Sequence, residues 1–263
     1  MIEALKIALE DMLLGTKKWR LWVYLANHDL IIRYKRSWLG ITWVLISFSL
    51  FVITKVAVFG VLAQKDLAFF SVYLSVGFMT FKFISAVVID GANALTASEG
   101  WIKGESLPLS IYIYRAITRN LIVASYTAPP VLLICIYFNV FSLSFFITII
   151  PVLLTFCLNA VWISGVLAMI CARHRDLSHL VSMGMSMTYF LTPVLWVQPE
   201  TGLLSIIAKY NPFTYFIDIL RAPLLEQTIP FDSWAIVGGI TGLGFILLLF
   251  VFGLYKNKII YWL

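Results

Sequence analysis

Six long apolar runs, separated by polar loops, constrain this chain more than any other feature of its sequence. Each run is long enough to cross the hydrocarbon core of a bilayer as a helix, which takes about 20 residues. The runs cover residues 39–62, 68–89, 121–138, 145–170, 178–197 and 234–255. The sequence therefore predicts an all-α polytopic membrane protein with six transmembrane helices.

The positive charge alternates between the loops in step with these runs. If the runs cross the membrane in turn, 14 of the 19 Lys and Arg residues fall on one side. The opposite side receives only Lys65, Lys209 and Arg221, while Lys55 and Lys82 lie inside runs. Because cytoplasmic loops are enriched in Lys and Arg, we expect both termini in the cytoplasm. The net charge of +6 then indicates contact with anionic lipids, and we expect no nucleic-acid partner.

The composition leaves room for one membrane domain. Of the 263 residues, 61% are hydrophobic and 12% are charged. We expect a single domain over residues 1–263, with an arm at 1–38, a six-helix region at 39–255 and a cytoplasmic tail at 256–263.

Three segments outside the runs carry their own patterns. The arm alternates apolar and charged residues at helical spacing and mixes aromatic with basic side chains, which predicts amphipathic helices at the membrane interface. Residues 90–110 have room for one or two short cytoplasmic helices. Residues 198–233 hold two apolar pieces that are too short to span and too apolar for a solvated loop. We expect these pieces to form two re-entrant helices, separated at Asn211-Pro212.

Residues suited to catalysis are scarce. The six runs contain no Asp or Glu, and His28, His174 and His179 have no evident partner spacing. The sequence has no phosphate-binding glycine-rich loop, and its three cysteines lack metal-ligand spacing. We therefore expect no enzyme, no catalytic or metal site, and no cofactor in this chain.

Three runs instead carry stripes of polar and aromatic residues at helical spacing. Lipid gives no reason to gather charge and hydroxyls on one helix face, so the stripes predict a shared passage. Aromatic rings with scattered hydroxyls suit sugars. The alternative is ordinary helix packing, with Lys55 and Lys82 extending to the nearby membrane surface. The candidate lining residues are Phe48, Phe51, Lys55, Phe59, Ser75, Phe78, Lys82, Ser182, Ser186, Tyr189 and Trp196.

Four ordered motifs resemble the membrane subunits of type 2 ATP-binding-cassette polysaccharide exporters. Residues 28–43 read HDLIIRYKRSWLGITW, similar to the pattern with which those proteins begin their first span. Residues 101–122 are similar to the family's cytoplasmic loop, residues 175–196 to its fourth loop and fifth span, and residues 211–221 to its outer segment. One departure is Ile46-Ser47-Phe48, where many relatives have a proline.

The resemblance implies a permease domain that exports a lipid-linked polysaccharide across the bacterial cytoplasmic (inner) membrane. It implies a homodimer with two copies of a separate ATPase, which binds ATP and Mg²⁺. O-antigen on undecaprenyl diphosphate is the first expectation for the cargo, with capsular polysaccharide or teichoic acid as the alternative. Two other classes are a membrane-embedded glycosyl- or phosphotransferase and a passive scaffold or scramblase.

Three groups of residues have expected roles; the resemblance implies the first two, and the third is predicted from charge at headgroup depth. The cytoplasmic loop is the ATPase-coupling element, and the outer segment forms the outer gate. The basic end of the arm is placed to receive the cargo's diphosphate, because charge-assisted hydrogen bonds to phosphate are strong. The groups are Glu99, Trp101, Lys103 and Glu105 for coupling; Asn211, Pro212, Phe213 and Arg221 for the gate; and Arg33, Lys35 and Arg36 for the diphosphate.

Overall fold

The computed structural model describes residues 2–62 and 66–263, and every regular element in these ranges is helical. Lys65, which the charge pattern assigned to the outer side, lies outside the described residues. The principal helices are α1 (Ile2–Lys17), α2 (Trp19–Tyr34), α3 (Thr42–Leu62), α4 (Leu67–Asn93), α5 (Glu99–Gly104), α6 (Ser110–Tyr137), α7 (Leu143–Arg173), α8 (Leu177–Leu191), α9 (Leu203–Tyr210), α10 (Pro212–Leu225), α11 (Phe231–Tyr255) and α12 (Ile259–Trp262). Single 3-10 turns, η1 (Thr96–Ser98) and η2 (Lys256–Lys258), precede α5 and α12.

Five segments are long and apolar enough to cross a membrane: Thr42–Gly60, Leu67–Asn93, Ser110–Tyr137, Leu143–Arg173 and Phe231–Trp262. They correspond to five of the six predicted runs. The remaining run forms α8, which is 15 residues long. Its helix stops because Pro193 cannot donate a backbone hydrogen bond and forces the preceding Thr192 into an extended conformation, with a ψ of 138°.

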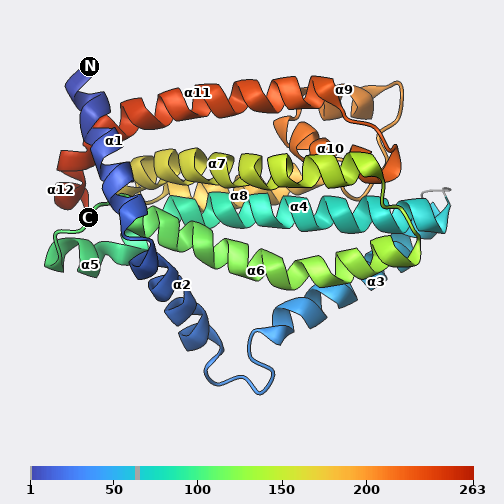
Figure 1. Cartoon of the computed structure of the whole chain (residues 1–263), viewed down its shortest axis with the longest axis horizontal. Helices are drawn as coiled ribbons and strands as arrows, with labels where there is room; N and C mark the ends of the chain where they lie inside the picture. Colours follow the sequence, from blue (N-terminus) through green and yellow to red (C-terminus); the bar gives the residue numbers. More distant parts are fainter. Residues whose placement is uncertain (1, 63–65) are drawn as a thin grey trace.

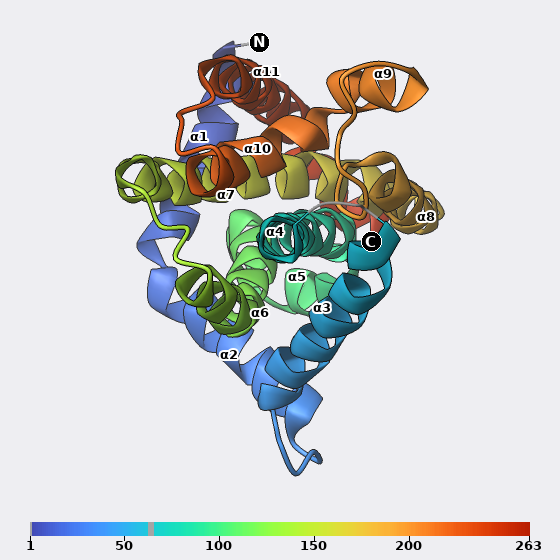
Figure 2. The same cartoon turned by 90° about the vertical axis from the view of Figure 1, so that its right-hand side faces the viewer.

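Helix α4 lies at the centre of the bundle, with α3, α6, α7 and α8 around it (Figure 2). Its side chains Phe70, Leu74 and Phe81 are buried in the main core. The close approach of α4 to α7 depends on Gly91, because a Cβ atom there would lie 2.6 Å from the Cα of Ser164. Helix α4 is thus both buried and in contact with several other helices.

The short helices divide between the two ends of the bundle. Helices α1, α5 and α12 gather with both termini at one end, whereas α9 and α10 lie toward the other (Figure 1). The two outer pieces predicted from sequence therefore form two short helices, α9 and α10. Asn211 separates them and caps α10 by accepting a 3.0 Å hydrogen bond from the Phe213 amide.

The N-terminal arm folds against the bundle as two helices. On α1, the buried Asp11 accepts hydrogen bonds from the amides of Leu109 and Ser110 at 3.2 and 3.0 Å. It also pairs with Lys256 at 2.9 Å. Asp11 thereby ties the arm to the start of α6 and to the C-terminal segment. An acidic side chain at a helix N-terminus also complements the helix dipole.

Candidate passage, gate and coupling surfaces

The stripes predicted on the first, second and fifth runs meet around Lys55. Its ammonium group lies 4.1 Å from the ring centre of Phe78 on α4 and 4.5 Å from that of Tyr189 on α8. It also donates a hydrogen bond to the Tyr189 hydroxyl, and the Phe51 ring is 5.6 Å away. Among the described residues, no carboxylate pairs with Lys55. The aromatic faces therefore supply its main stabilising contacts.

The other candidate lining residues differ in accessibility. Phe51 is 58% exposed, whereas Phe48 is completely buried and stacks on Phe78. Ser75 is also completely buried and donates to the Val72 carbonyl of its own helix. Lys82 lies 5.4 Å from the Phe48 ring. Phe48 thus supports the Lys55 cluster through Phe78, and both Phe48 and Ser75 are buried within the chain.

The stripe on α8 includes Ser182 and Ser186 before Tyr189, and its last member, Trp196, lies after the end of the helix. Ser186 is exposed and Ser182 is half-buried, and each donates to the carbonyl one turn earlier. Trp196 follows the end of α8 and donates to the Phe190 carbonyl at 3.1 Å. Phe59, at the far end of the α3 stripe, is half-buried against the main core. Ser186 and Phe51 are therefore the most accessible members of the set.

The predicted gate residues hold α10 against α4 and against the break after α8. Arg221 is 7% exposed; its guanidinium lies 3.6 Å from the Tyr73 ring centre and donates to the Pro193 carbonyl at 2.9 Å. The Asn211 amide donates to Thr192 at 2.8 Å. Pro212 occupies the first turn of α10, where its missing amide costs nothing. Phe213 packs edge-on against Phe81.

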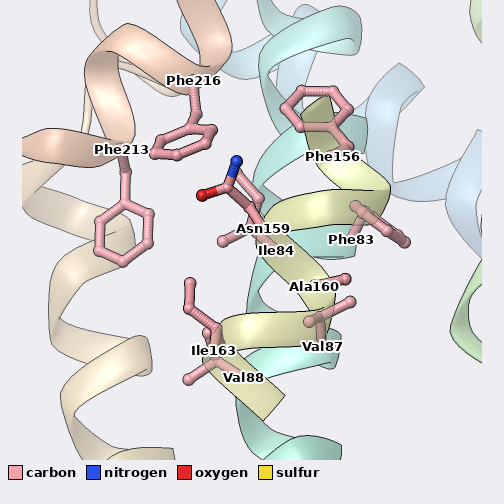
Figure 3. Close-up of a pocket in the computed structure, with 10 residues that line it drawn as sticks. All are labelled: Phe83, Ile84, Val87, Val88, Phe156, Asn159, Ala160, Ile163, Phe213 and Phe216. Atoms are coloured by element: carbon pink, nitrogen blue, oxygen red, sulfur yellow. The ribbon is translucent and has the colours of Figure 1, made fainter. Parts of the chain in front are cut away.

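A small apolar cavity lies behind the gate, between α4, α7 and α10. Its volume is about 30 Å³, and its lining includes Phe83, Phe156, Phe213 and Phe216 (Figure 3). Asn159 points toward it, but its amide is already bonded to Thr155 and Thr241. A space that holds only one or two water-sized groups cannot accommodate a sugar ring. We therefore regard it as a packing defect beside α10.

The predicted coupling residues lie on α5 at the end of the bundle that carries both termini. Glu99 pairs with Lys103 at 2.7 Å and with Arg175, which precedes α8, at 3.1 Å. The hydrogen bond from Lys103, reinforced by the two positive charges, lowers the pKa of Glu99. Trp101 is 50% exposed, and Lys103 and Glu105 are also exposed. An exposed tryptophan beside charged groups is typical of a protein-binding surface.

The three basic residues proposed for the diphosphate lie at the end of α2 and in the turn that follows it. Arg33, Lys35 and Arg36 are all exposed. The neighbouring Trp38 is 95% exposed. The structure thus leaves these cations free of carboxylate partners within the described part of the chain.

Sequence reasoning overlooked an ionic network at the same end of the bundle. Asp29 on α2 accepts a 2.8 Å hydrogen bond from Nε of Arg115, a second bond from Nη2 of Arg115, and a 3.2 Å bond from Arg119. Arg119 also bonds to Asp90 on α4 at 2.8 Å. Burial alone raises the pKa of Asp29, but the two arginines outweigh it and hold that pKa below its usual value.

No family model matches the chain, but curated proteins do. The chain is 25% identical to the O-antigen export system permease protein RfbA of Myxococcus xanthus over 217 residues, which cover 80% of this chain and 82% of that protein. Two RfbA proteins of Klebsiella pneumoniae are 24% and 23% identical over 226 residues, covering 82% of this chain and 85% of each relative. These relatives confirm the resemblance to polysaccharide-exporter permeases that the motifs indicated. They are named as transport proteins rather than enzymes.

Proposed function

We propose that this chain is the permease subunit of an ATP-driven exporter of lipid-linked polysaccharide. The observation that carries the proposal is its similarity, over about four fifths of its length, to permeases of O-antigen export systems. Five segments suited to crossing a membrane agree with that role. The proposed cargo is O-antigen on undecaprenyl diphosphate, moved across the bacterial inner membrane. Capsular polysaccharide or teichoic acid is the alternative cargo.

The proposed passage runs between two copies of this chain. The support within one copy is the cluster of Lys55, Phe78 and Tyr189, flanked by the exposed Phe51 and Ser186. Rings and hydroxyls contact sugars weakly and repeatedly, so a polymer can slide past them. Lys55 adds a hydrogen-bond donor that no carboxylate occupies in the described residues.

The proposed topology has six crossings, with both termini in the cytoplasm. Helix α8 makes the sixth crossing together with residues 192–197. In this segment the Pro193 carbonyl accepts from Tyr73 and Arg221, and the Trp196 carbonyl accepts from Tyr73. Irregular backbone at membrane depth is tolerated where protein groups satisfy it. Helices α9 and α10 then re-enter the outer leaflet as the gate. The two termini at one end of the bundle agree with this topology.

The cytoplasmic end carries the two remaining roles. Arg33, Lys35 and Arg36 receive the diphosphate at headgroup depth. The surface of α5, with Glu99, Trp101, Lys103 and Glu105, docks on the ATPase subunit, which supplies ATP and Mg²⁺.

The ATPase assignment is tested by copurification with the candidate ATPase subunit. We expect Trp101→Ala to insert normally but to lose the ATPase, because removing a central aromatic anchor costs about 2 kcal/mol or more of binding free energy. The matched control is Trp19→Ala, since Trp19 is 54% exposed on α2, close to the 50% of Trp101. The control should retain the ATPase.

The same preparation separates the three functional classes. An exporter permease binds an ATPase whose hydrolysis depends on both subunits. A transferase modifies the lipid-linked sugar without ATP hydrolysis by a partner, and a passive scramblase needs no ATPase. Wild-type protein that never retains an ATPase would exclude the proposal, and unchanged retention by Trp101→Ala would exclude the docking surface on α5.

A further inference from the structure

The ionic network of Asp29, Asp90, Arg115 and Arg119 joins three helices that have different proposed tasks. Helix α2 carries Arg33 and leads into Lys35 and Arg36, the proposed cargo-binding cations, whereas α4 and α6 are the helices on either side of the proposed ATPase-docking segment. We propose that Asp29, through Arg115 and Arg119, transmits movement of the docking segment to the cargo-binding arm. The inference rests on the proposed function and assigns a coupling role to residues outside the docking surface and the passage.

Chain connectivity places the network at both ends of the docking segment. Asp90 lies one turn before the end of α4, and the chain then runs through η1 into α5. On the other side, α6 begins at Ser110 and presents Arg115 and Arg119 within its first three turns. The docking segment is therefore joined to the network on both sides by short stretches of chain, through η1 on one side and through residues 105–109 on the other.

Asp29 is the ionic link between this junction and α2. Among the residues that the structure describes, it is the one side chain of α2 in an ion pair. The buried side chains of α2 are Leu25, Ala26 and Leu30, and Trp22 packs against the Tyr114 ring of α6 at 5.8 Å. Arg33 follows Asp29 by one helical turn, so a displacement of Asp29 moves the proposed diphosphate site.

Arg119 bridges the two carboxylates of the network. One of its terminal nitrogens bonds to Asp29 and the other to Asp90, so a shift of α4 against α2 can strengthen one bond at the expense of the other. The side chains are partly buried, with 16% exposure for Asp29 and 18% for Arg119. Elements that pass between discrete packed states are the usual carriers of coupling between distant sites.

A polar cavity of about 70 Å³ lies between the network and η1, the turn that leads into α5. Its polar lining comes from Asp90, Asn93, Ser98, Tyr112, Arg115 and Arg119. Tyr112 is 1% exposed, and its hydroxyl has no hydrogen-bond partner; the same is true of Nε of Arg119. The cavity has space for several water molecules, which can bond to these unpaired donors. If the docking segment shifts, the donors can exchange one water contact for another, and no apolar packing has to break.

The test measures polymer exported per ATP hydrolysed by the complete complex in lipid vesicles. We expect Asp29→Arg to lower this ratio about tenfold, within the usual range for coupling between sites, while ATPase copurification and the hydrolysis rate stay close to wild type. Combining Asp29→Arg with Arg115→Asp should restore the ratio, because it recreates an attractive pair with the charges exchanged. The matched control is Lys6→Gln, which removes one partner of an exposed pair on α1.

Each outcome is decisive. A wild-type ratio in Asp29→Arg would overturn the inference, and so would a parallel fall in export and hydrolysis, which indicates a structural role alone. If Asp29→Arg fails to assemble, two other variants are tested: Asp29→Asn, and Asp29→Arg combined with Arg115→Asp. Both are judged by the amount of polymer exported per ATP hydrolysed. An exchanged pair that assembles without recovering export also contradicts the inference. Failure of the proposed function is distinct, since the wild-type complex itself would then not export.

Discussion

At the scale of single residues, Lys55 is the most specific feature of the proposed passage. It is held by three rings and a tyrosine hydroxyl from three helices, and no carboxylate within the described residues neutralises it. We expect Lys55→Met to reduce export about tenfold, because a hydrogen bond from a charged donor contributes about 1.5–3 kcal/mol. The ring cluster and dimer assembly should survive, since methionine packs well against aromatic faces.

The control for Lys55 is Lys209→Met on α9, where the lysine is exposed. Both substitutions remove one positive charge, so a general charge effect would change export equally in the two variants. Equal export by Lys55→Met and wild type, at equal expression, would remove Lys55 from the passage.

Residue roles divide into those that sequence could predict and those that depend on three-dimensional partners. Helical spacing placed Phe51, Phe78 and Tyr189 on the predicted stripes, and the structure brings the three rings together around Lys55. Spacing could not distinguish the exposed Phe51 from the buried Phe48, because they are three residues apart on the same stripe. The partners Asp29 and Arg115 are 86 residues apart, so periodicity within one run could not pair them.

At the scale of elements, the outer segment shows why some boundaries can be predicted. Asn211 and Pro212 supply a cap and a first-turn proline, and both signals act locally, so the break between α9 and α10 was predicted correctly. The fifth run was harder, because the run of apolar residues continues through Pro193 and hides the end of α8. Hydropathy measures how apolar a segment is, while the backbone decides where the helix stops.

The packing of α10 on α4 predicts a sharp difference between two glycines. A Cβ atom at Gly77 would lie 1.9 Å from Nη2 of Arg221, whereas a Cβ at Gly242 on α11 meets nothing within 4 Å. We expect Gly77→Ala to destabilise the protein by about 1–3 kcal/mol through overpacking and to displace the gate. Gly242→Ala should be neutral or slightly stabilising, because alanine favours helix by about 1 kcal/mol. Thermal unfolding of both variants in detergent measures the contrast, and equal midpoints would contradict the close packing of Arg221 on Gly77.

At the scale of the whole molecule, the arrangement separates tasks along the bundle. Helices α1, α5 and α12 lie at the end that carries both termini, α9 and α10 lie toward the other end, and the Lys55 cluster joins α3, α4 and α8. This order agrees with the proposed binding of cargo and ATPase at the end that carries the termini and with the proposed release past α9 and α10. The ionic network around Asp29 would then connect the two tasks of the cytoplasmic end.

The most direct test of the central claim is export by inverted membrane vesicles that contain this chain, its ATPase subunit and lipid-linked O-antigen. The quantity measured is the polymer that becomes protected from a glycosidase added outside the vesicles. The account predicts protection only when ATP, the ATPase subunit and this chain are all present, with the lipid-linked sugar chemically unchanged. Protection that proceeds without ATP, or an altered sugar linkage in place of protection, would contradict it.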